Sequence, residues 1–153
     1  MNLFSAIKIS SRGLRAERTR LNIASMNLAN AHVTRTLEGG PYRAKSVVFS
    51  SRPLERAETG GMISGQEDSF DKRLAQALET VEVTEIREDK TPFMEVFDPG
   101  HPDADENGIV RLPNVNVMEQ MVDIMSAQRA FEANISAIDT AKSMVMKAID
   151  IAR

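Results

Sequence analysis

The sequence predicts a mainly α-helical protein in which two long terminal helices pack as a coiled-coil-like pair, with an extended or small β-containing middle segment. Near both ends of the chain, apolar residues recur every seven positions, which is the spacing of a helix that packs along another helix. The middle carries Gly and Pro together with short β-branched runs, which favour turns and strands. We therefore expect an N-terminal helix in residues 1–34, an irregular middle in 35–113, and a C-terminal helix in 114–153.

The N-terminal helix is predicted from two apolar rows on roughly opposite sides of the helix. The first row consists of Ile7, Leu14, Leu21 and Leu28. The second consists of Ile9, Ala16 and Ile23. A helix that lies on a single core needs only one apolar row, so two rows indicate neighbours on two sides. Other copies of the chain or the rest of a single-chain bundle would both supply such neighbours.

Three asparagines, Asn22, Asn27 and Asn30, fall within nine positions of this helix. Asparagine is a mediocre helix former, because its amide competes for nearby backbone groups. Their presence indicates either the end of the helix or a role for side-chain amides in a packed helical interface. For Asn30 both interpretations stay open.

The middle segment begins with a turn at Gly39, Gly40 and Pro41. The run YRAKSVVF, residues 42–49, is apolar and β-branched enough to predict a strand. A short amphipathic helix is expected at about 67–80, with Phe70, Leu74, Ala77, Leu78 and Val81 on its apolar side. Two further strands, 91–97 and 108–112, are expected on either side of an acidic loop.

The C-terminal helix has the strongest pattern in the chain. Its main row consists of Val117, Ile124, Phe131, Ile138, Val145 and Ala152. Three residues fill intervening positions of the same seam: Met121, Ile135 and Ile149. A neighbouring row of small residues would let a partner helix approach closely: Ala127, Asn134, Ala141 and Ala148. No Gly or Pro interrupts residues 114–153, so we expect a helix on the order of 55 Å long.

Charge and composition restrict the classes of function. The chain has no cysteine, which excludes disulfides and thiolate chemistry. No window approaches the roughly 18 apolar residues of a membrane span, so no membrane insertion is expected. The N-terminal residues lack the apolar stretch of about 7–15 residues in a cleavable secretory signal. Residues 1–36 carry six basic and one acidic side chain, a net +5, whereas 37–116 carry nine and sixteen, a net −7. This asymmetry suits nucleic acid, a membrane surface or complementary contacts between copies.

We find no pattern of an enzyme and expect no cofactor. The sequence DADENG, with Asp103, Asp105, Asn107 and Gly108, matches the start of a calcium loop, but its twelfth position is Asn114 where a Glu is needed. We therefore interpret it as an acidic turn between two strands. The two histidines, His32 and His101, have no ligand at metal-binding spacing, and solvated or turn positions are expected for them.

Five basic residues follow one another along the first helix: Lys8, Arg12, Arg15, Arg18 and Arg20. Nucleic-acid binding through them is not favoured, because aromatic residues for base stacking are missing and the rest of the chain is acidic. A solvated or subunit-contacting face is the expected interpretation.

Four stretches together resemble the proximal rod protein of the bacterial flagellar basal body, the FlgC family. They are LNIASMNLANA, GGPYRAKSVVF, PNVNVMEQMVDIMSAQRAFEAN and KSMVMKAIDIAR. The resemblance covers about the first 50 and the last 60 residues, and residues 64–90 have no counterpart that we can place. Three positions depart mildly from the family pattern: Met26, Phe131 and Ala152.

The resemblance implies an axial structural protein that polymerises into the periplasmic proximal rod and transmits torque from motor to hook and filament. It implies export without a cleavable signal through the flagellar type III apparatus, and partners that are other copies and other rod proteins, including the rod-base adaptor. The apolar rows named above, with Asn22, Asn27, Asn30 and Asn134, are then the expected subunit-packing residues. Two alternatives remain at this point: a cytoplasmic helical adaptor or coiled-coil interaction protein, and a nucleic-acid-binding protein.

Overall fold

The computed structural model describes residues 3–37, 39–54 and 78–151 of the chain. In chain order the described elements are α1 (Leu3–Ala29), β1 (Lys45–Pro53), β2 (Glu79–Glu88), β3 (Met94–Phe97), β4 (Ile109–Leu112) and α3 (Val117–Ile151). Along the chain, two long helices therefore flank a small β-containing middle, as the sequence predicts.

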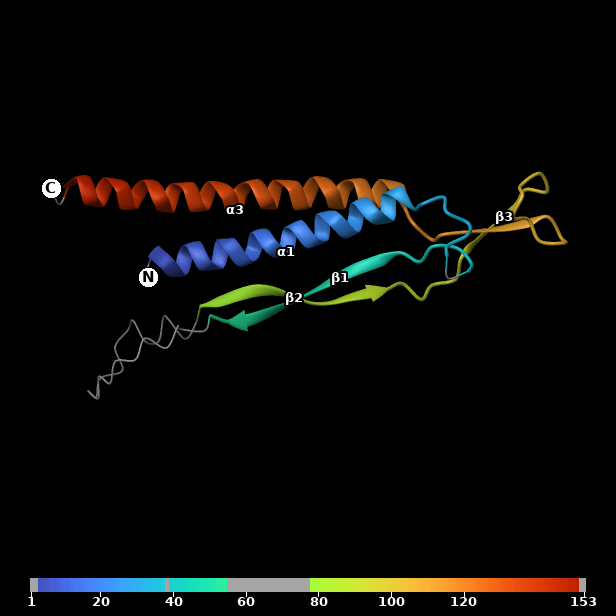
Figure 1. Ribbon diagram of the computed structural model, residues 1–153, viewed down its shortest axis with the longest axis horizontal. Coiled ribbons are helices and arrows are strands. Elements are labelled where there is room, and N and C mark those ends of the chain that lie inside the picture. Colours follow the sequence, from blue (N-terminus) through green and yellow to red (C-terminus); the bar gives the residue numbers. More distant parts are fainter. Residues whose placement is uncertain (1–2, 38, 55–77, 152–153) are drawn as a thin grey trace.

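The two helices lie side by side and antiparallel, so the two ends of the chain are found at the same end of an elongated molecule (Figure 1). The start of α3 is capped by Asn116, whose Oδ1 accepts hydrogen bonds from the backbone N–H groups of Met118 at 3.1 Å and Glu119 at 3.4 Å. Such a cap satisfies N–H groups that have no partner within the helix. At the other junction, the Asn30 side chain donates to the Met26 carbonyl at 2.8 Å, just after α1 ends.

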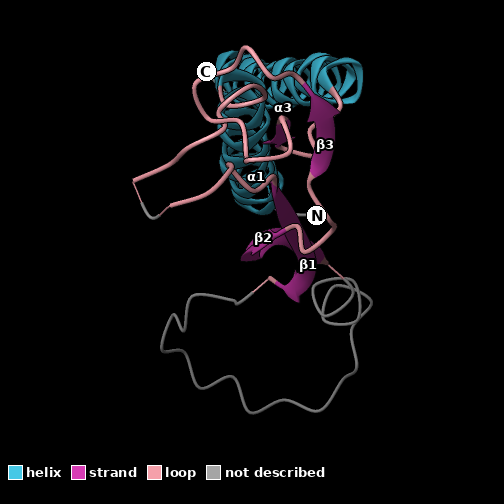
Figure 2. Ribbon diagram, turned by 90° about the vertical axis from the view of Figure 1, so that its right-hand side faces the viewer, coloured by secondary structure: helices cyan, strands magenta, loops and turns pink. Residues whose placement is uncertain are grey.

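Two separate two-stranded antiparallel sheets form the middle. The longer one pairs β1 with β2 from Lys45 opposite Glu88 to Pro53 opposite Glu79, with a bulge after Val48. It lies against α1 on the side away from α3, so α1 is the central layer (Figures 1 and 2). The second sheet pairs β3 with β4 around the acidic loop.

All three expected strands are present. The strands expected at 42–49 and 91–97 each begin three residues later, at Lys45 and Met94, and the one expected at 108–112 begins at Ile109. Residues 67–77 of the expected short helix lie outside the described residues. Its last two residues, Glu79 and Thr80, belong to β2, so the prediction is wrong there. The segment ETVEVTEIRE has the two-residue alternation of a strand, and pairing with β1 satisfies its backbone.

The buried positions of the helix pair are small. Among the described residues, the buried apolar side chains are Ala16, Ala24, Ala31, Val110, Pro113, Ala127 and Ala141, and the buried polar ones are Asn27 and Thr80. Alanines allow two helix axes to approach closely, but each alanine buries only a small apolar area. The predicted small row of the C-terminal helix therefore faces α1 of the same chain at Ala127 and Ala141, whereas Ala148 is exposed. In the part of the chain that the structure describes, no helix is apolar enough over a sufficient length to cross a bilayer.

Candidate functional site: the helix pair and its exposed side

The α1 surface that meets α3 follows a heptad row made of Gly13, Arg20 and Asn27. At the Gly13 end, a Cβ atom would come within 3.1 Å of the side-chain amide of Asn134 on α3. The helices touch here because glycine has no side chain. In the middle, Arg20 Nη2 lies 2.7 Å from Asp123 Oδ1 of α3. Polar and small residues therefore set the alignment of the two helices.

At the other end of this row, Asn27 makes four hydrogen bonds. Its Oδ1 accepts from the Tyr42 hydroxyl and from the Lys45 backbone N–H, both at 2.9 Å. Its Nδ2 donates to the Lys45 carbonyl at 2.7 Å and to Gln120 Oε1 at 3.0 Å. These bonds fill the capacity of a primary amide, and the side chain is only 2% exposed. Asn27 thus joins α1, the start of β1 and α3 at one point.

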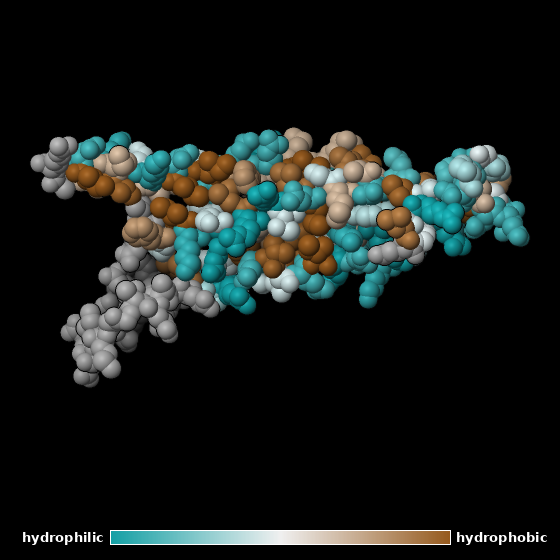
Figure 3. Space-filling view, viewed as in Figure 1, coloured by the Kyte–Doolittle hydropathy of each residue, from teal (hydrophilic) through white to brown (hydrophobic). Residues whose placement is uncertain are grey.

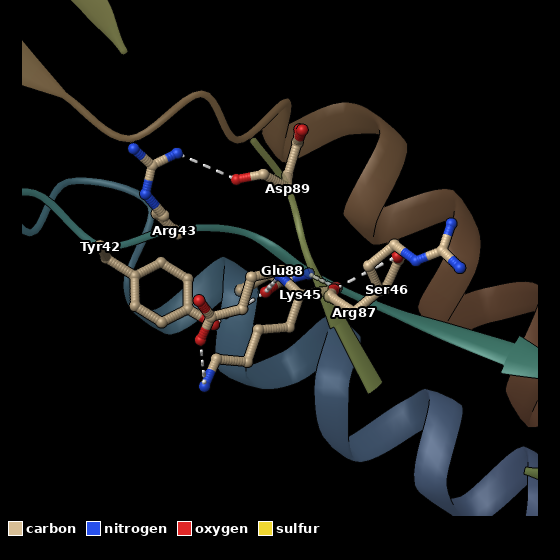
Figure 4. Close-up of polar contacts among 8 residues, drawn as sticks. Tyr42, Arg43, Lys45, Ser46, Arg87, Glu88 and Asp89 are labelled. Atoms are coloured by element: carbon tan, nitrogen blue, oxygen red, sulfur yellow. Dashed lines mark hydrogen bonds and ion pairs between the residues drawn. The ribbon is translucent and has the colours of Figure 1, made fainter. Parts of the chain in front are cut away.

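The residues around this junction add charged contacts (Figure 4). Lys45 Nζ lies 3.3 Å from Glu88 Oε1 across the β1–β2 pair. Arg43 donates to the Asp89 carbonyl at 3.1 Å. Burial, and secondarily the negative charge of Glu88, raise the pKa of Tyr42 above its ordinary value. The Tyr42 hydroxyl therefore stays protonated at neutral pH and remains a donor to Asn27.

The other asparagines occupy different environments. The Asn30 amide donates to the carbonyl four residues earlier, which matches the interpretation that it ends the helix. Asn134 donates to the Ala130 carbonyl at 2.9 Å while its amide lies against Gly13. Asn22 is exposed. Their role between subunits stays a prediction, and the contacts of Asn27 and Asn134 described here lie within one chain.

The predicted main rows lie along the helix pair. All four members of the first α1 row, and Val117, Ile124, Phe131, Ile138 and Val145 of α3, are partly buried. The intervening α3 positions that meet α1 are Gln120, Ala127, Asn134 and Ala141. We expected Met121, Ile135 and Ile149 within this seam. They lie beside it and are exposed.

A stripe of exposed apolar side chains runs along one side of α3, and we call it the α3 stripe. Its members and their exposed fractions are Met118 (70%), Met121 (45%), Met125 (54%), Ile135 (40%), Met146 (56%) and Ile149 (59%). Figure 3 shows hydrophobic residues at the surface along the helical part of the molecule. An exposed apolar surface of this extent on a helix is typical of a protein–protein contact. The single chain buries one side of α3 and leaves this one open.

The acidic loop has the form of a turn between β3 and β4. Asp103 Oδ2 accepts a hydrogen bond from Thr34 at 2.7 Å, and Asp105 lies 3.8 Å from Arg111. Gly108 has a φ of +72°, which favours glycine at the turn. No group of three or more His, Cys, Asp or Glu side chains within the described ranges is arranged to hold a metal ion.

One histidine and two arginines of α1 make hydrogen bonds to other parts of the same chain. His101 Nδ1 accepts from the Asp103 N–H at 3.1 Å, and His32 is exposed. Arg12 donates to the buried Thr80 hydroxyl of β2 at 2.8 Å, so it attaches α1 to the sheet as Arg20 attaches it to α3. The basic residues of α1 are therefore divided between contacts inside the chain and an exposed side.

The chain is similar in sequence to known flagellar rod proteins. A family model described as the C-terminal part of flagellar basal body rod FlgEFG proteins matches residues 106–151. The flagellar basal-body rod protein FlgC of Borreliella burgdorferi is 42% identical over 99% of this chain and 98% of its own length. FlgC of Salmonella typhimurium is 38% identical over 99% and 98%, respectively. FlgC of Bacillus subtilis is 36% identical over the full length of both.

Proposed function

Because the chain belongs to the family of the flagellar basal-body rod protein FlgC, it is a structural component of the rod, and we propose that it acts there as an axial subunit of the proximal rod. In this role it polymerises with other copies and with other rod proteins, and it passes torque from the motor towards the hook and filament. The observation that carries the proposal is the α3 stripe, an apolar surface left open along a helix of 35 residues.

The packing that we propose uses both sides of α3. The half-buried row from Val117 to Val145 and the small residues beside it hold α1 within the chain. The α3 stripe then contacts helices of neighbouring subunits, with coiled-coil-like interdigitation of side chains. Methionine suits such a contact, because its flexible thioether adapts to partners of different shape. Asn22 lies on the exposed side of α1 and is available to a neighbouring subunit.

Localisation and export follow from the same role. A subunit of the rod must reach the basal body, and we propose that this chain does so through the flagellar type III export apparatus, to build the periplasmic part of the axis. The relatives support this location, because they are named as basal-body rod proteins.

The test is to place a charge in the α3 stripe and to compare it with the same charge elsewhere on α3. Ile135→Glu replaces an apolar side chain of the proposed contact by a carboxylate, and removing that charge from water costs several kcal/mol at every subunit. Ser126→Glu is the matched control, because Ser126 is also exposed and nine residues away, about 180° round the helix.

We expect that Ile135→Glu abolishes incorporation into basal bodies and motility in cells that lack the native protein, whereas Ser126→Glu retains both. Immunoblots of purified basal bodies and swimming assays measure these outcomes. Normal rods with Ile135→Glu would show that the α3 stripe is not a subunit contact. Absence of the wild-type chain from purified basal bodies would contradict the rod function itself.

A further inference from the structure

The exposed side of α1 is basic along the first two-thirds of the helix. The exposed positions recur at alternating intervals of four and three residues: Phe4, Lys8, Ser11, Arg15, Arg18, Asn22 and Ser25. This surface, which we call the α1 stripe, contains no acidic residue, because the one carboxylate of α1, Glu17, is partly buried beside Arg20. Across the described residues, neither Arg15 nor Arg18 has a carboxylate within ion-pair distance.

Two carboxylates lie between the apolar members of the α3 stripe, near the middle of the helix. Glu132 and Asp139 are both exposed, and they lie seven residues apart in the same heptad row as Met125 and Met146. Exposed Ile135 lies between them, three residues after the first and four before the second. Glu132 accepts one hydrogen bond, from Gln128 at 3.2 Å. In the described chain no cation lies within ion-pair distance of either carboxylate.

The two stripes point away from each other within one chain. The α1 residues that meet α3 are Gly13, Arg20 and Asn27. Arg15 lies two residues from Gly13, about 200° round the helix, and is therefore on the far side of α1. The carboxylates of α3 lie outside the seam of residues that meets α1. Within the described residues, the charges of Arg15 and Arg18 on α1 and of Glu132 and Asp139 on α3 have no ion-pair partner, so they are open to contact with another molecule.

We propose that the α1 stripe of one copy packs on the α3 stripe of the next copy, with Arg15, Arg18 and Asn22 facing Glu132 and Asp139. This inference rests on the rod function proposed above, and it names the two surfaces that meet. The spacing agrees, because Arg15 and Asn22 are seven residues apart, as are the two carboxylates. Each pair of positions is separated by about 10.5 Å along its helix axis.

The chemistry of both surfaces suits this contact. The aliphatic stems of the arginines cover Ile135, while the guanidinium groups reach the carboxylates on either side of it. Because the two surfaces differ, the contact is head-to-tail, and a head-to-tail contact that does not close into a ring generates an open helical polymer. Charge complementarity specifies which helix meets which, a choice that apolar rows alone leave open.

The experiment exchanges the charges. The double variant Arg15→Glu/Arg18→Glu and the double variant Glu132→Arg/Asp139→Arg should each lower incorporation into basal bodies at least about tenfold. Combining all four changes should restore incorporation to within about threefold of wild type, because the charges are again complementary. Arg35→Glu/Lys90→Glu is the control, since it reverses two exposed charges outside both stripes. The secreted amount of every variant is measured so that loss of export is recognised.

Two outcomes would overturn the inference: double variants that assemble as the control does, or a fourfold variant no better than its parents. Wild-type incorporation in the same strains shows that the rod function stands in either case.

Cysteine cross-linking provides a second measurement, because the chain has no cysteine of its own. Ser11→Cys is combined with Gln128→Cys for a parallel contact, or with Ser143→Cys for an antiparallel one. A disulfide-linked ladder of copies from one pair is expected, and no ladder from either pair in assembled rods would contradict the proposed contact.

Discussion

Replacing Asn27 by Ala removes the amide that joins α1, β1 and α3, and leaves four groups without their partner. Two of them, the N–H and the carbonyl of Lys45, are backbone groups held at the start of β1. The other two, the Tyr42 hydroxyl and Gln120 Oε1, are partly exposed and can turn towards water. The substitution therefore tests whether the junction depends on hydrogen bonding.

The magnitude follows from these four bonds. An unsatisfied buried backbone group costs about 1–3 kcal/mol, and a bond whose partner can be hydrated costs about 0.5–1 kcal/mol. Alanine recovers several tenths of a kcal/mol through its higher helix propensity. With the lower end of each range, the free energy of unfolding falls by about 2–3 kcal/mol, a large fraction of the stability of a chain with so few buried apolar side chains among its described residues.

The assay is equilibrium unfolding in urea, followed by circular dichroism at 222 nm, with the same concentration of trimethylamine N-oxide in every sample to strengthen the folded state. Asn27→Asp is the matched variant, because it keeps the shape of the side chain but brings a carboxylate oxygen against two acceptors. It should lower the free energy of unfolding at neutral pH at least as much as Asn27→Ala. Asn22→Ala is the control, since Asn22 is exposed on the same helix, and should change stability by less than about 0.5 kcal/mol.

The reasoning fails if Asn27→Ala unfolds at the same urea concentration as the control. A wild-type-like Asn27→Asp together with a destabilised Asn27→Ala would show that side-chain volume, and not hydrogen bonding, holds the junction.

Two further predictions test other contacts. Gly13→Val should lower the thermal unfolding midpoint, although it replaces a poor helix former, because its Cβ meets the Asn134 amide at 3.1 Å. Adding Asn134→Ala should recover part of the loss. Independent effects of the two substitutions on the midpoint would contradict the contact. Hydrogen bonds from the backbone N–H and then from the hydroxyl of Thr91 lower the pKa of Asp89, so its contribution to stability is present at neutral pH and is lost as pH falls through the lowered pKa. NMR titration should show this pKa rise partway towards the ordinary value in Thr91→Ala, and an unchanged pKa would rule out the side-chain bond as a cause.

Much of the fold could be predicted from local pattern. The uninterrupted apolar rows and the absence of Gly and Pro predict α3, and an Asn before Val117 with a Glu in the first turn agrees with its start. The turn at Gly39–Pro41 and the β-branched runs predict three of the four described strands. The fourth, β2, was missed, because its first residues follow a stretch whose apolar spacing also fits a helix.

The candidate site was predicted only in part. The sequence indicates that α3 has apolar residues on more than one side, and Met121, Ile135 and Ile149 are indeed apolar positions next to the seam. Which of these sides is covered within the chain depends on where α1 lies. The row of α1 that meets α3 contains Gly13 and Arg20, residue types that a search for hydrophobic periodicity passes over.

The sequence by itself determined the two terminal helices, the irregular middle and the family of the chain, because helix periodicity and turn residues act over a few neighbouring positions. The tertiary structure decided the partners. Asn27 and Lys45 are eighteen residues apart, and Asn27 and Gln120 are ninety-three apart. Contacts over such separations depend on how the helices and the sheet are placed in space. That placement buries Asn27, divides the basic residues of α1 into inner and outer sets, and leaves the α3 stripe open for another molecule.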